Sequence, residues 1–379
     1  MLFERLAGPN GNIPVLIRDD DTNFFTKTKM LESVYSKAWN EGFKVCLSVV
    51  PLQRGINDIC VPPEMRTTGL LYSIDENRDL IYYLKGKIHD ELVEVLQHGL
   101  SHDYAKGARG EFGINCSKKD NIKLGMGIIK KAFEVEPSFF VPPGEDVSKQ
   151  NLKASLALGM IPVYRHTFFD RFLRHSFIPD TAKQTALKIF MSRYNSNNNK
   201  IQTLDEKYLF QFVKPVIISV GKCAITWSLP KIIKSANLTS FESLFKLTSK
   251  VIEYSIINRN PVCIINHYHL YYYDWSSSIS RNDLLKAWKQ ILISFDKLKF
   301  AWKVSFSELY DRVKRIQDIQ IVKTGSKITI QSNVHIQDFS FRSFHSLEPN
   351  ASVMLDRETK ILTIKSLQPQ TKIILYEKT

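Results

Sequence analysis

The sequence predicts an α/β fold built on a mainly parallel sheet, followed by a small all-β module. Up to about residue 315, short apolar stretches typical of strands alternate with longer helical patterns, which indicates a parallel sheet, either open or closed into a barrel. From about residue 319 the helical patterns stop, and short β-branched stretches follow one another with turn residues between them. We therefore expect two domains, residues 1–315 and 316–379.

The elements of the first domain follow from the spacing of its apolar residues. Strands are expected at 13–17, 43–50, 94–97, 138–141, 161–164, 216–220 and 261–265. Helical patterns lie at Leu31–Ala38, about 76–92, Ile122–Phe133, Leu152–Leu156, Phe241–Ser255 and Leu284–Phe295. Residues 52–75 are expected to form a long loop. In the second domain, strands are expected at Ile319–Val322, Lys327–Gln331, Ser352–Leu355, Ile361–Ile364 and Ile373–Tyr376.

Composition and charge restrict the class of protein. The chain has 379 residues, of which 44% are hydrophobic and 24% charged, and this is ordinary for a globular protein with a large core. Its net charge of +14 indicates either an anionic partner, such as an acidic glycan, nucleic acid or lipid headgroups, or simply a basic solvated surface. The charge alone does not separate these two interpretations.

Cysteine use and the N-terminal residues favour a cytoplasmic location. The five cysteines are odd in number and form no CxxC pair, and Cys46 and Cys263 lie inside apolar strand-like stretches, where a reduced thiol packs as a small hydrophobe. This pattern is typical of a reducing compartment. The N-terminus has no secretory-signal pattern, and no uncharged apolar stretch has the roughly 18 residues that a membrane span requires.

An acidic cluster follows the first predicted strand. Asp19, Asp20 and Asp21 come at the end of the apolar stretch 13–17. Three adjacent carboxylates at the end of a buried strand need a counter-charge, and a divalent cation is a common one. The cluster is therefore a candidate metal site.

Histidines follow two other predicted strands. His98 and His102 are four residues apart, a spacing that places both imidazoles on one side of a turn and is usual for half of a zinc site. His267 and His269 follow the strand at 261–265. Because the carboxyl ends of parallel strands lie at one edge of a sheet, these side chains are expected to converge with the acidic cluster. Taken singly, each histidine could equally be a surface or hydrogen-bonded residue.

The order of these motifs resembles the polysaccharide deacetylase family, carbohydrate esterase family four and its relatives. The matching features are a strand followed by Asp-Asp, then His98-x-x-x-His102, then the bend 142–144 (Pro-Pro-Gly), then a strand followed by His267. The resemblance covers about residues 13 to 305. It implies a distorted (β/α) barrel of the polysaccharide deacetylase type, and a metal-dependent hydrolase that removes N-acetyl or O-acetyl groups from a glycan or a sugar-containing precursor.

The resemblance also implies roles for individual residues. Asp20, His98 and His102 would hold a divalent cation, most simply Zn²⁺, that activates a water molecule as the nucleophile. Asp19 would be the general base and His267 the general acid. The backbone N–H of Gly144 would bind the oxyanion. The implied partner is a carbohydrate, and an anionic carbohydrate would suit the basic charge of the chain. Neither nucleic acid binding nor a membrane span is expected. The oligomeric state is not indicated.

The sequence departs from the family pattern in four places. Asp21 stands where the family usually has glycine, so its role is open, and Val141 stands where the family often has an arginine that orients the base. Arg18 is a candidate replacement for that arginine. The family's Asp-x-x-Asp-Trp segment is reduced to Thr226-Trp227. His269 competes with His267 for the role of acid.

Several neighbouring residues have two interpretations each. Tyr268 and the aromatic residues at 271–273 and 275 either stack on sugar rings or pack on the core. Asp103 either orients a ligand histidine or is a turn residue. Arg165 and His166 follow a predicted strand and are candidates for substrate contact.

Two other functions fit parts of the sequence. In a nucleotide-sugar glycosyltransferase, Asp19-Asp20-Asp21 would serve as a motif for a metal and a diphosphate, but this leaves His98 and His102 without a role. In an inactive glycan-binding relative the fold would persist without catalysis, and the missing arginine at 141 would favour that.

Overall fold

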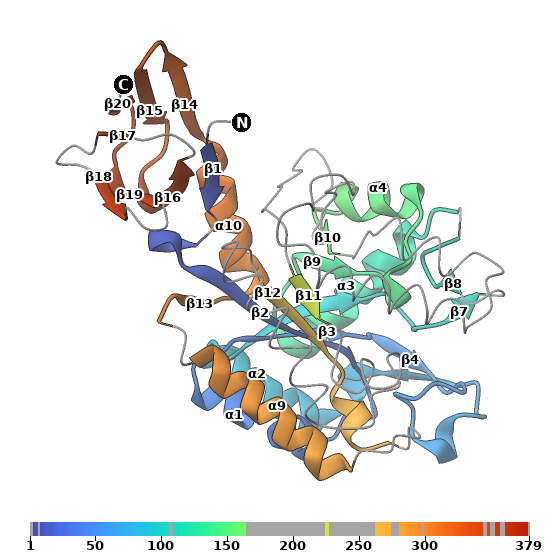
Figure 1. The fold of residues 1–379 in the computed structure, drawn as a ribbon. Coiled ribbons are helices and arrows are strands. Elements are labelled where there is room, and N and C mark those ends of the chain that lie inside the picture. The colour runs from blue at the N-terminus through green and yellow to red at the C-terminus, as the bar shows by residue number, and fades with distance from the viewer. Residues whose placement is uncertain are drawn as a thin grey trace, which may run out of the picture.

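The computed structural model describes residues 3–6, 8–105, 109–114, 116–163, 224–226, 262–273, 280–296, 299–343, 347–348, 353–356 and 361–377 (Figure 1). The strand predicted at 216–220 and the helix predicted at 241–255 lie outside these residues. Among the helices that are described, none is both long enough and apolar enough to cross a membrane. Cys46, Cys60, Cys116 and Cys263 are free thiols.

A parallel sheet runs through the first domain, with β2 in its interior (Figure 1). In spatial order its strands are β10 (Ile161–Pro162), β9 (Phe139–Val141), β6 (Val93–His98), β3 (Val45–Val49), β2 (Ile13–Thr22), β12 (Val262–Asn266) and β11 (Ala224–Thr226), and β13 (Ala301–Lys303) also pairs with β2. Every pairing is parallel. The carboxyl ends of β2, β6, β9 and β12 therefore lie at one edge.

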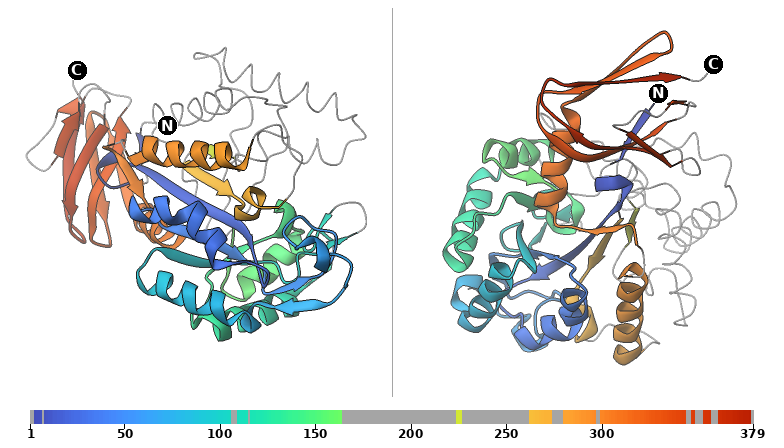
Figure 2. Two further views of the ribbon diagram at one scale, coloured as in Figure 1. Left: turned by 90° about the horizontal axis from the view of Figure 1, so that it is seen from below. Right: turned by 90° about the vertical axis from the view of Figure 1, so that its left-hand side faces the viewer.

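Both faces of this sheet are buried, because successive apolar side chains of its strands pack on opposite sides. Ile13, Val15 and Ile17 of β2 pack into one apolar cluster with side chains of the helices, whereas Leu16 packs into a second cluster on the other face. The helices that contribute to the first cluster are α1 (Thr28–Asn40), α2 (Arg78–His89), α3 (Lys119–Phe133) and α9 (Arg281–Asp296). Figure 2 shows α1 and α9 on the same side of the sheet.

The second face is covered by α10 (Phe306–Gln317), which contributes Phe306, Leu309 and Val313 to the second cluster. The sheet is curled into part of a barrel, with helices packed against it. The prediction of a distorted (β/α) barrel followed by an all-β module is thus confirmed.

Helix α10 begins against a carboxylate of the sheet. Ser305 and Glu308 form a capping box at its N-terminus. Glu94 of β6 accepts hydrogen bonds from the backbone N–H groups of Phe306 (2.8 Å) and Ser307 (3.0 Å). Burial raises the pKa of Glu94, although these bonds partly offset the effect. One acid therefore satisfies two N–H groups that the helix cannot satisfy itself.

The C-terminal module is a pair of antiparallel sheets packed around a shared apolar core. One sheet contains β14 (Ile319–Thr324), β15 (Lys327–Ser332), β20 (Lys372–Glu377) and β17 (Leu347–Glu348); the other contains β1 (Phe3–Leu6), β16 (Ile336–Ser343), β19 (Ile361–Leu367) and β18 (Val353–Asp356). The five strands predicted in this region are confirmed. The pairing of β1 with β16 was not predicted, and it places the first strand of the chain in this module (Figure 1). The division at residue 315 stays a prediction.

Two other parts of the fold differ from the sequence analysis. The predicted long loop contains η2 (Pro63–Met65) and a short hairpin of β4 (Leu52–Arg54) and β5 (Leu71–Ser73). Strand β2 does not end before the acidic cluster but continues through Thr22, so the three aspartates lie within the strand. This second difference decides where each carboxylate points.

We expect Glu94→Ala to lower the free energy of unfolding by about 2 kcal/mol, because two buried N–H groups at the start of α10 would lose their acceptor. Urea denaturation followed by circular dichroism measures this. Glu136→Ala, which removes an exposed carboxylate paired with Lys130, is the matched control and should change stability by less than about 0.5 kcal/mol. Equal losses in the two variants would contradict the anchoring role.

Candidate metal centre

The three aspartates of β2 are all buried, yet each enters a different environment. Asp19 and Asp20 point to opposite sides because successive residues of a strand alternate. The pairing register with β3 shifts between Asp20 and Thr22, and Asp21 has a φ of +75°. This bulge redirects the Asp21 side chain, a common role of bulges beside functional sites.

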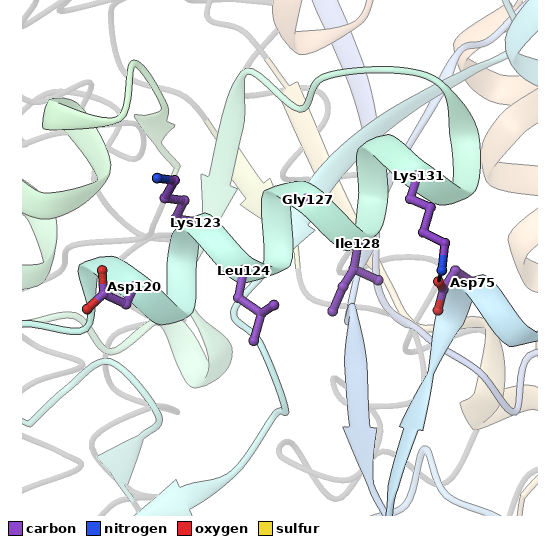
Figure 3. Close-up of a pocket in the computed structure, with 7 residues that line it drawn as sticks. All are labelled: Asp75, Asp120, Lys123, Leu124, Gly127, Ile128 and Lys131. Carbon is purple, nitrogen blue, oxygen red and sulfur yellow. Dashed lines mark ion pairs between the residues drawn. The ribbon is translucent and has the colours of Figure 1, made fainter.

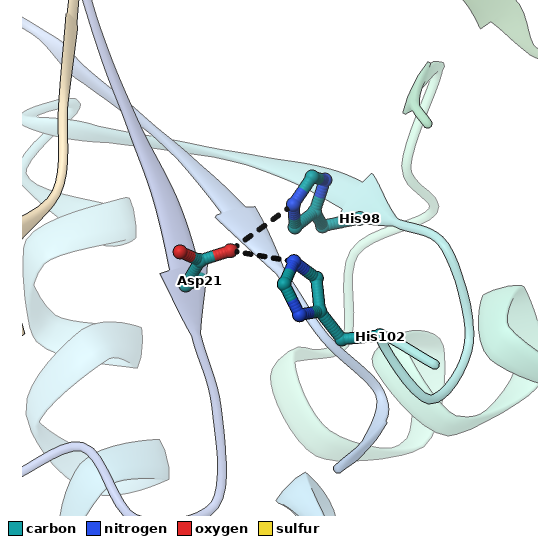
Figure 4. A group of neighbouring side chains, drawn as sticks. All are labelled: Asp21, His98 and His102. Carbon is teal, nitrogen blue, oxygen red and sulfur yellow. Dashed lines mark ion pairs between the residues drawn. The ribbon is translucent and has the colours of Figure 1, made fainter. Parts of the chain in front are cut away.

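Asp21 meets the histidine pair (Figure 4). Its Oδ1 lies 3.2 Å from His98 Nε2 and 3.0 Å from His102 Nε2, and the three side chains are buried. One donor atom from each lies within 4.8 Å of the others, so the three could share one ion. A tetrahedral Zn²⁺ with bonds of about 2.0–2.1 Å holds its ligand atoms about 3.3 Å apart, and the observed separations fit that arrangement.

The hydrogen bond at Nδ1 of each imidazole determines whether Nε2 of the same ring carries a proton. His98 Nδ1 lies 3.0 Å from the carbonyl oxygen of Val141, which can only accept, and His102 Nδ1 lies 3.0 Å from Asp58 Oδ2. Both Nδ1 atoms therefore donate, and in the neutral imidazoles both Nε2 atoms present lone pairs. Those lone pairs face a carboxylate oxygen, so a positive species must stand between them or the rings must be protonated. Partners of this kind commonly orient metal-binding histidines.

The electrostatics of the cluster favour positive charge. Burial lowers the pKa of His102, but Asp21 and Asp58 more than offset this and raise it well above its usual value. Burial likewise raises the pKa of Asp21, but the histidines, His102 first, bring it well below the usual value. The pocket is thus built to hold a cation beside an ionised Asp21.

The loop between the histidines requires glycine at its second position. Gly99 has a φ of +61°, and a Cβ there would lie 2.5 Å from the ring of Pro143. Glu111 accepts hydrogen bonds from the backbone N–H groups of Leu100 (3.0 Å) and Ser101 (3.1 Å). His102 itself has a φ of +57°, a conformation uncommon outside glycine that recurs at functional sites. The 142–144 bend therefore packs against the histidine loop through the ring of Pro143.

Asp20 pairs with a buried arginine. Arg18 is 1% exposed, and its Nη2 lies 2.7 Å from Asp20 Oδ2 and also contacts Glu145, which follows the proline bend. Burial raises the pKa of Asp20, but Arg18, followed by His98, more than compensates and lowers it below its usual value. Among the residues that the structure describes, none hydrogen-bonds Asp20 Oδ1. Asp20 is thus an ionised carboxylate with one oxygen available.

Asp19 lies on the opposite side, among the helices. Its Oδ2 accepts hydrogen bonds from the Tyr35 hydroxyl and from the backbone N–H of Tyr268 (2.7 Å). Burial raises the pKa of Asp19 well above its usual value, and these two bonds only partly offset the rise. Within the described part of the chain, Asp19 therefore differs from Asp20 in having no guanidinium beside it.

His267 and His269 approach the other oxygen of Asp21. They follow β12 and lie at η5 (Tyr268–Tyr271), and their Nε2 atoms are 3.7 Å and 2.9 Å from Asp21 Oδ2. Both are buried. Asp21 thus has imidazoles on both oxygens, and the predicted convergence of the strand ends is present in the structure.

The structure groups Asp21, and not Asp20, with the two histidines. Asp20, predicted as a metal ligand, lies outside the group of residues that could share an ion, because β2 continues through the acidic cluster and bulges there. Asp19, predicted as the base, faces the helices instead.

Tyr268, predicted to contact substrate, is fully buried, and its hydroxyl lies 2.6 Å from Thr26 Oγ1, so the core interpretation holds for this residue. Gly144 lies in the bend with a φ of +64°. Asp103 pairs with Arg54 rather than with a histidine. Trp227, Arg165, His166 and Trp275 lie outside the described residues.

Three supporting acids were not predicted from the sequence: Asp58, Glu111 and Glu145. Asp58 and Glu111 lie in segments without periodicity, so no spacing links them to the histidines. Only Glu145, directly after the proline bend, stood beside a recognised motif.

A surface hollow of about 490 Å³ lies on α3, away from this cluster (Figure 3). It is lined by Asp75, Asp120, Lys123, Leu124, Gly127, Ile128 and Lys131, and an ion pair of 2.6 Å joins Lys131 to Asp75. It contains neither an imidazole nor a thiol, so the candidate chemistry lies at Asp21.

Comparison with known proteins gives structural neighbours only. No family model matches the chain, and no curated protein matches it. The chain is similar to the Xyl-CE4 domain of a multidomain xylanase from the hindgut metagenome of Trinervitermes trinervoides, with 12% identity, 79% of this chain and 91% of that chain covered, and a TM-score of 0.39. It is also similar to peptidoglycan deacetylase PdaC from Bacillus subtilis (10% identity, 82% and 96% covered, TM-score 0.41).

A third neighbour is a family 4 acetyl xylan esterase from Clostridium thermocellum in complex with a cobalt ion (13% identity, 79% and 90% covered, TM-score 0.36). These neighbours are carbohydrate esterases and deacetylases by name. They belong to the group that the motif order resembles.

Metal binding should depend on Asp21 and not on Asp20. We expect Asp21→Ala to weaken Zn²⁺ or Co²⁺ binding by at least about 100-fold, because one of three ligands is lost, and Asp20→Asn to change it by less than about threefold. Titration against a competing chelator measures both. The opposite ranking would return the ligand role to Asp20.

Asp58 should tune the same site through His102. We expect Asp58→Ala to weaken metal binding by about 10- to 100-fold, since the imidazole would lose the acceptor that fixes its tautomer. Asp75→Ala, which removes a carboxylate that pairs with Lys131 of α3 and does not belong to the ligand group, is the control and should leave affinity unchanged. An unchanged affinity in Asp58→Ala would mean that this hydrogen bond does not support the ligand.

Proposed function

We propose that the protein is a metal-dependent hydrolase that removes N-acetyl or O-acetyl groups from a glycan or a sugar-containing precursor. The observation that carries this proposal is the meeting of Asp21 Oδ1 with two imidazole nitrogens whose other nitrogens are already committed as donors. Three ligands suit a catalytic site because a tetrahedral ion keeps a position for water or substrate. The order of motifs along the chain supports the substrate class.

Asp21, His98 and His102 would hold the cation. Two nitrogens and one oxygen suit Zn²⁺, the metal that we propose. A divalent cation there would supply a Lewis acid that lowers the pKa of a water molecule and polarises the acyl carbonyl. Asp58 and the Val141 carbonyl hold the imidazoles with Nε2 toward that position.

Asp20 would be the general base. Its Oδ2 is held by Arg18, and its Oδ1 is buried next to the histidine cluster with no partner in the described part of the chain. A carboxylate held in this way keeps its orientation and stays ionised, so its free oxygen can take the proton of the attacking water. Arg18 thereby supplies the charge that the family usually places at position 141.

His267 would be the general acid. It lies across Asp21 from the ligand histidines, where an Nε2 proton could pass to the departing amine or alkoxide. The backbone N–H of Gly144, in the bend below the histidine loop, would stabilise the oxyanion. His269 is fully buried against Asp21 and would serve mainly to hold that carboxylate.

The other functions fit the site less well. A metal and diphosphate motif would use the aspartates together, whereas here each of them has its own partners. An inactive relative would not need a paired base and a histidine opposite the ligands. The net charge of +14 suits an anionic glycan, and the reduced thiols suit a cytoplasmic location; both remain part of the proposal.

The proposal predicts acetate release that depends on metal and on Asp20. With acetylated substrates such as N-acetylglucosamine oligomers and acetylated xylan, chelation should abolish release and added Zn²⁺ should restore it. Asp20→Asn should lower kcat by about 100- to 10,000-fold while metal affinity is retained. Acetate assays and metal titration of the same samples measure this, with Asp75→Asn as control. Stoichiometric metal and glycan binding without acetate release from any substrate would instead indicate a binding protein.

A further inference from the structure

Asp19 is a buried carboxylate for which the proposed reaction has no use. Its side chain is completely buried in β2, at the centre of the first domain. A buried carboxylate is costly unless its hydrogen bonds do something that an apolar side chain cannot do. The groups that it binds therefore indicate its role.

One of those groups lies between two histidines of the site. Asn266, the last residue of β12, is the register partner of Asp19, and the chain turns into η5 directly afterwards. The backbone N–H of Tyr268 donates to Asp19 Oδ2 at 2.7 Å. Since Tyr268 separates His267 from His269, this bond holds the backbone at the point between the two imidazoles.

The second group that Asp19 binds, the Tyr35 hydroxyl, connects it to further residues of the same segment. The Tyr35 hydroxyl donates to Asp19 Oδ2 and accepts from Asn266 Nδ2 (3.0 Å). Asn266 Oδ1 in turn accepts from the Tyr271 hydroxyl (3.2 Å). The network thus reaches the residue before His267 and the last residue of η5, and it joins both to β2 and α1.

An apolar residue could not make these bonds. Leucine at position 19 would leave the Tyr268 N–H and the Tyr35 hydroxyl buried without their acceptor, at a cost similar to that of burying the carboxylate. Asparagine, by contrast, has the same shape and keeps one acceptor oxygen. A role in positioning and a role in proton transfer therefore make different predictions for this substitution.

We propose that Asp19 is a positioning residue that fixes the segment from Asn266 to Tyr271, and with it His267 and His269, against the strand that carries Asp20 and Asp21. The role in catalysis rests on the proposed function. The hold on the segment does not, because it follows from the hydrogen bonds alone.

The kinetic test compares Asp19→Asn with Asp19→Ala in the metal-loaded protein. We expect Asp19→Asn to keep kcat within about fivefold of the wild type, and Asp19→Ala to lose about 30- to 100-fold in kcat with KM and Zn²⁺ affinity changed less than about threefold. Loss of activity in Asp19→Asn as complete as in Asp20→Asn would overturn the proposal, because it would make Asp19 a proton acceptor. Failure of the proposed function would appear differently, as no activity in the wild type.

Hydrogen–deuterium exchange tests the positioning without any substrate. We expect the peptide covering residues 266–271 to exchange at least about tenfold faster in Asp19→Ala and at the wild-type rate in Asp19→Asn, while the peptide covering residues 98–102 is unchanged. Glu94→Ala is the matched control, since it removes another buried acceptor of two backbone N–H groups, those at the start of α10. It should leave 266–271 as in the wild type.

A second variant covers the case in which Asp19→Ala does not fold. Tyr35→Phe removes the hydroxyl that joins Asp19 to Asn266 and keeps the ring in the core. We expect it to accelerate exchange in 266–271 by about threefold or more. Unchanged exchange there in Tyr35→Phe, or equal acceleration in Glu94→Ala, would overturn the proposal.

Discussion

The constraint on which the site depends is that a carboxylate oxygen faces the lone pairs of two imidazoles inside the protein. Asp21 Oδ1 lies about as far from His98 Nε2 and His102 Nε2 as two ligands of one ion lie from each other. Such an arrangement is repulsive unless a positive species stands among the three atoms or the imidazoles are protonated. The surrounding structure maintains it nonetheless, because Asp58 and the Val141 carbonyl prevent the rings from turning their N–H groups toward Asp21. The folded structure therefore favours a positive charge beside Asp21.

The bulge in β2 makes this arrangement compatible with two further buried acids. Without it, alternation would send Asp19 and Asp21 to the same face of the sheet. The bulge and the left-handed backbone of Asp21 let three successive carboxylates reach three sets of partners: the helix layer, a guanidinium and the histidines. Their mutual repulsion is reduced because each has its own hydrogen-bond donors. The bulge and the left-handed backbone of Asp21 are unfavourable in themselves, but they separate the three carboxylates.

Much of this could be predicted from the sequence, because it depends on periodicity. The apolar stretches predicted β3, β6, β9 and β12, and parallel strands necessarily bring His98, the 142–144 bend and His267 to one edge. The grouping of Asp21 with the histidines was not predicted, because a strand was assumed to end where its apolar residues end. Strand β2 instead continues through buried acids that are satisfied by distant partners. The roles of Asp58 and Glu111 could not be predicted for a related reason. A single acid in a segment without periodicity cannot be linked to the histidines until the chain is folded.

The place of Arg18 follows from where β9 and β2 direct their side chains. Val141 is the register partner of His98 and packs its side chain into the cluster that also contains Leu16 and Cys46. A long cationic side chain there would have to leave that cluster to reach Asp20. Arg18 precedes Asp20 by two residues and so lies on the same face of the same strand, where its guanidinium meets Asp20 and Glu145 without displacing the core. The counter-charge can therefore be supplied from β2 instead of from β9 while the carboxylate that it orients keeps its place. This requires an acid beyond the bend to balance the buried cation, as Glu145 does.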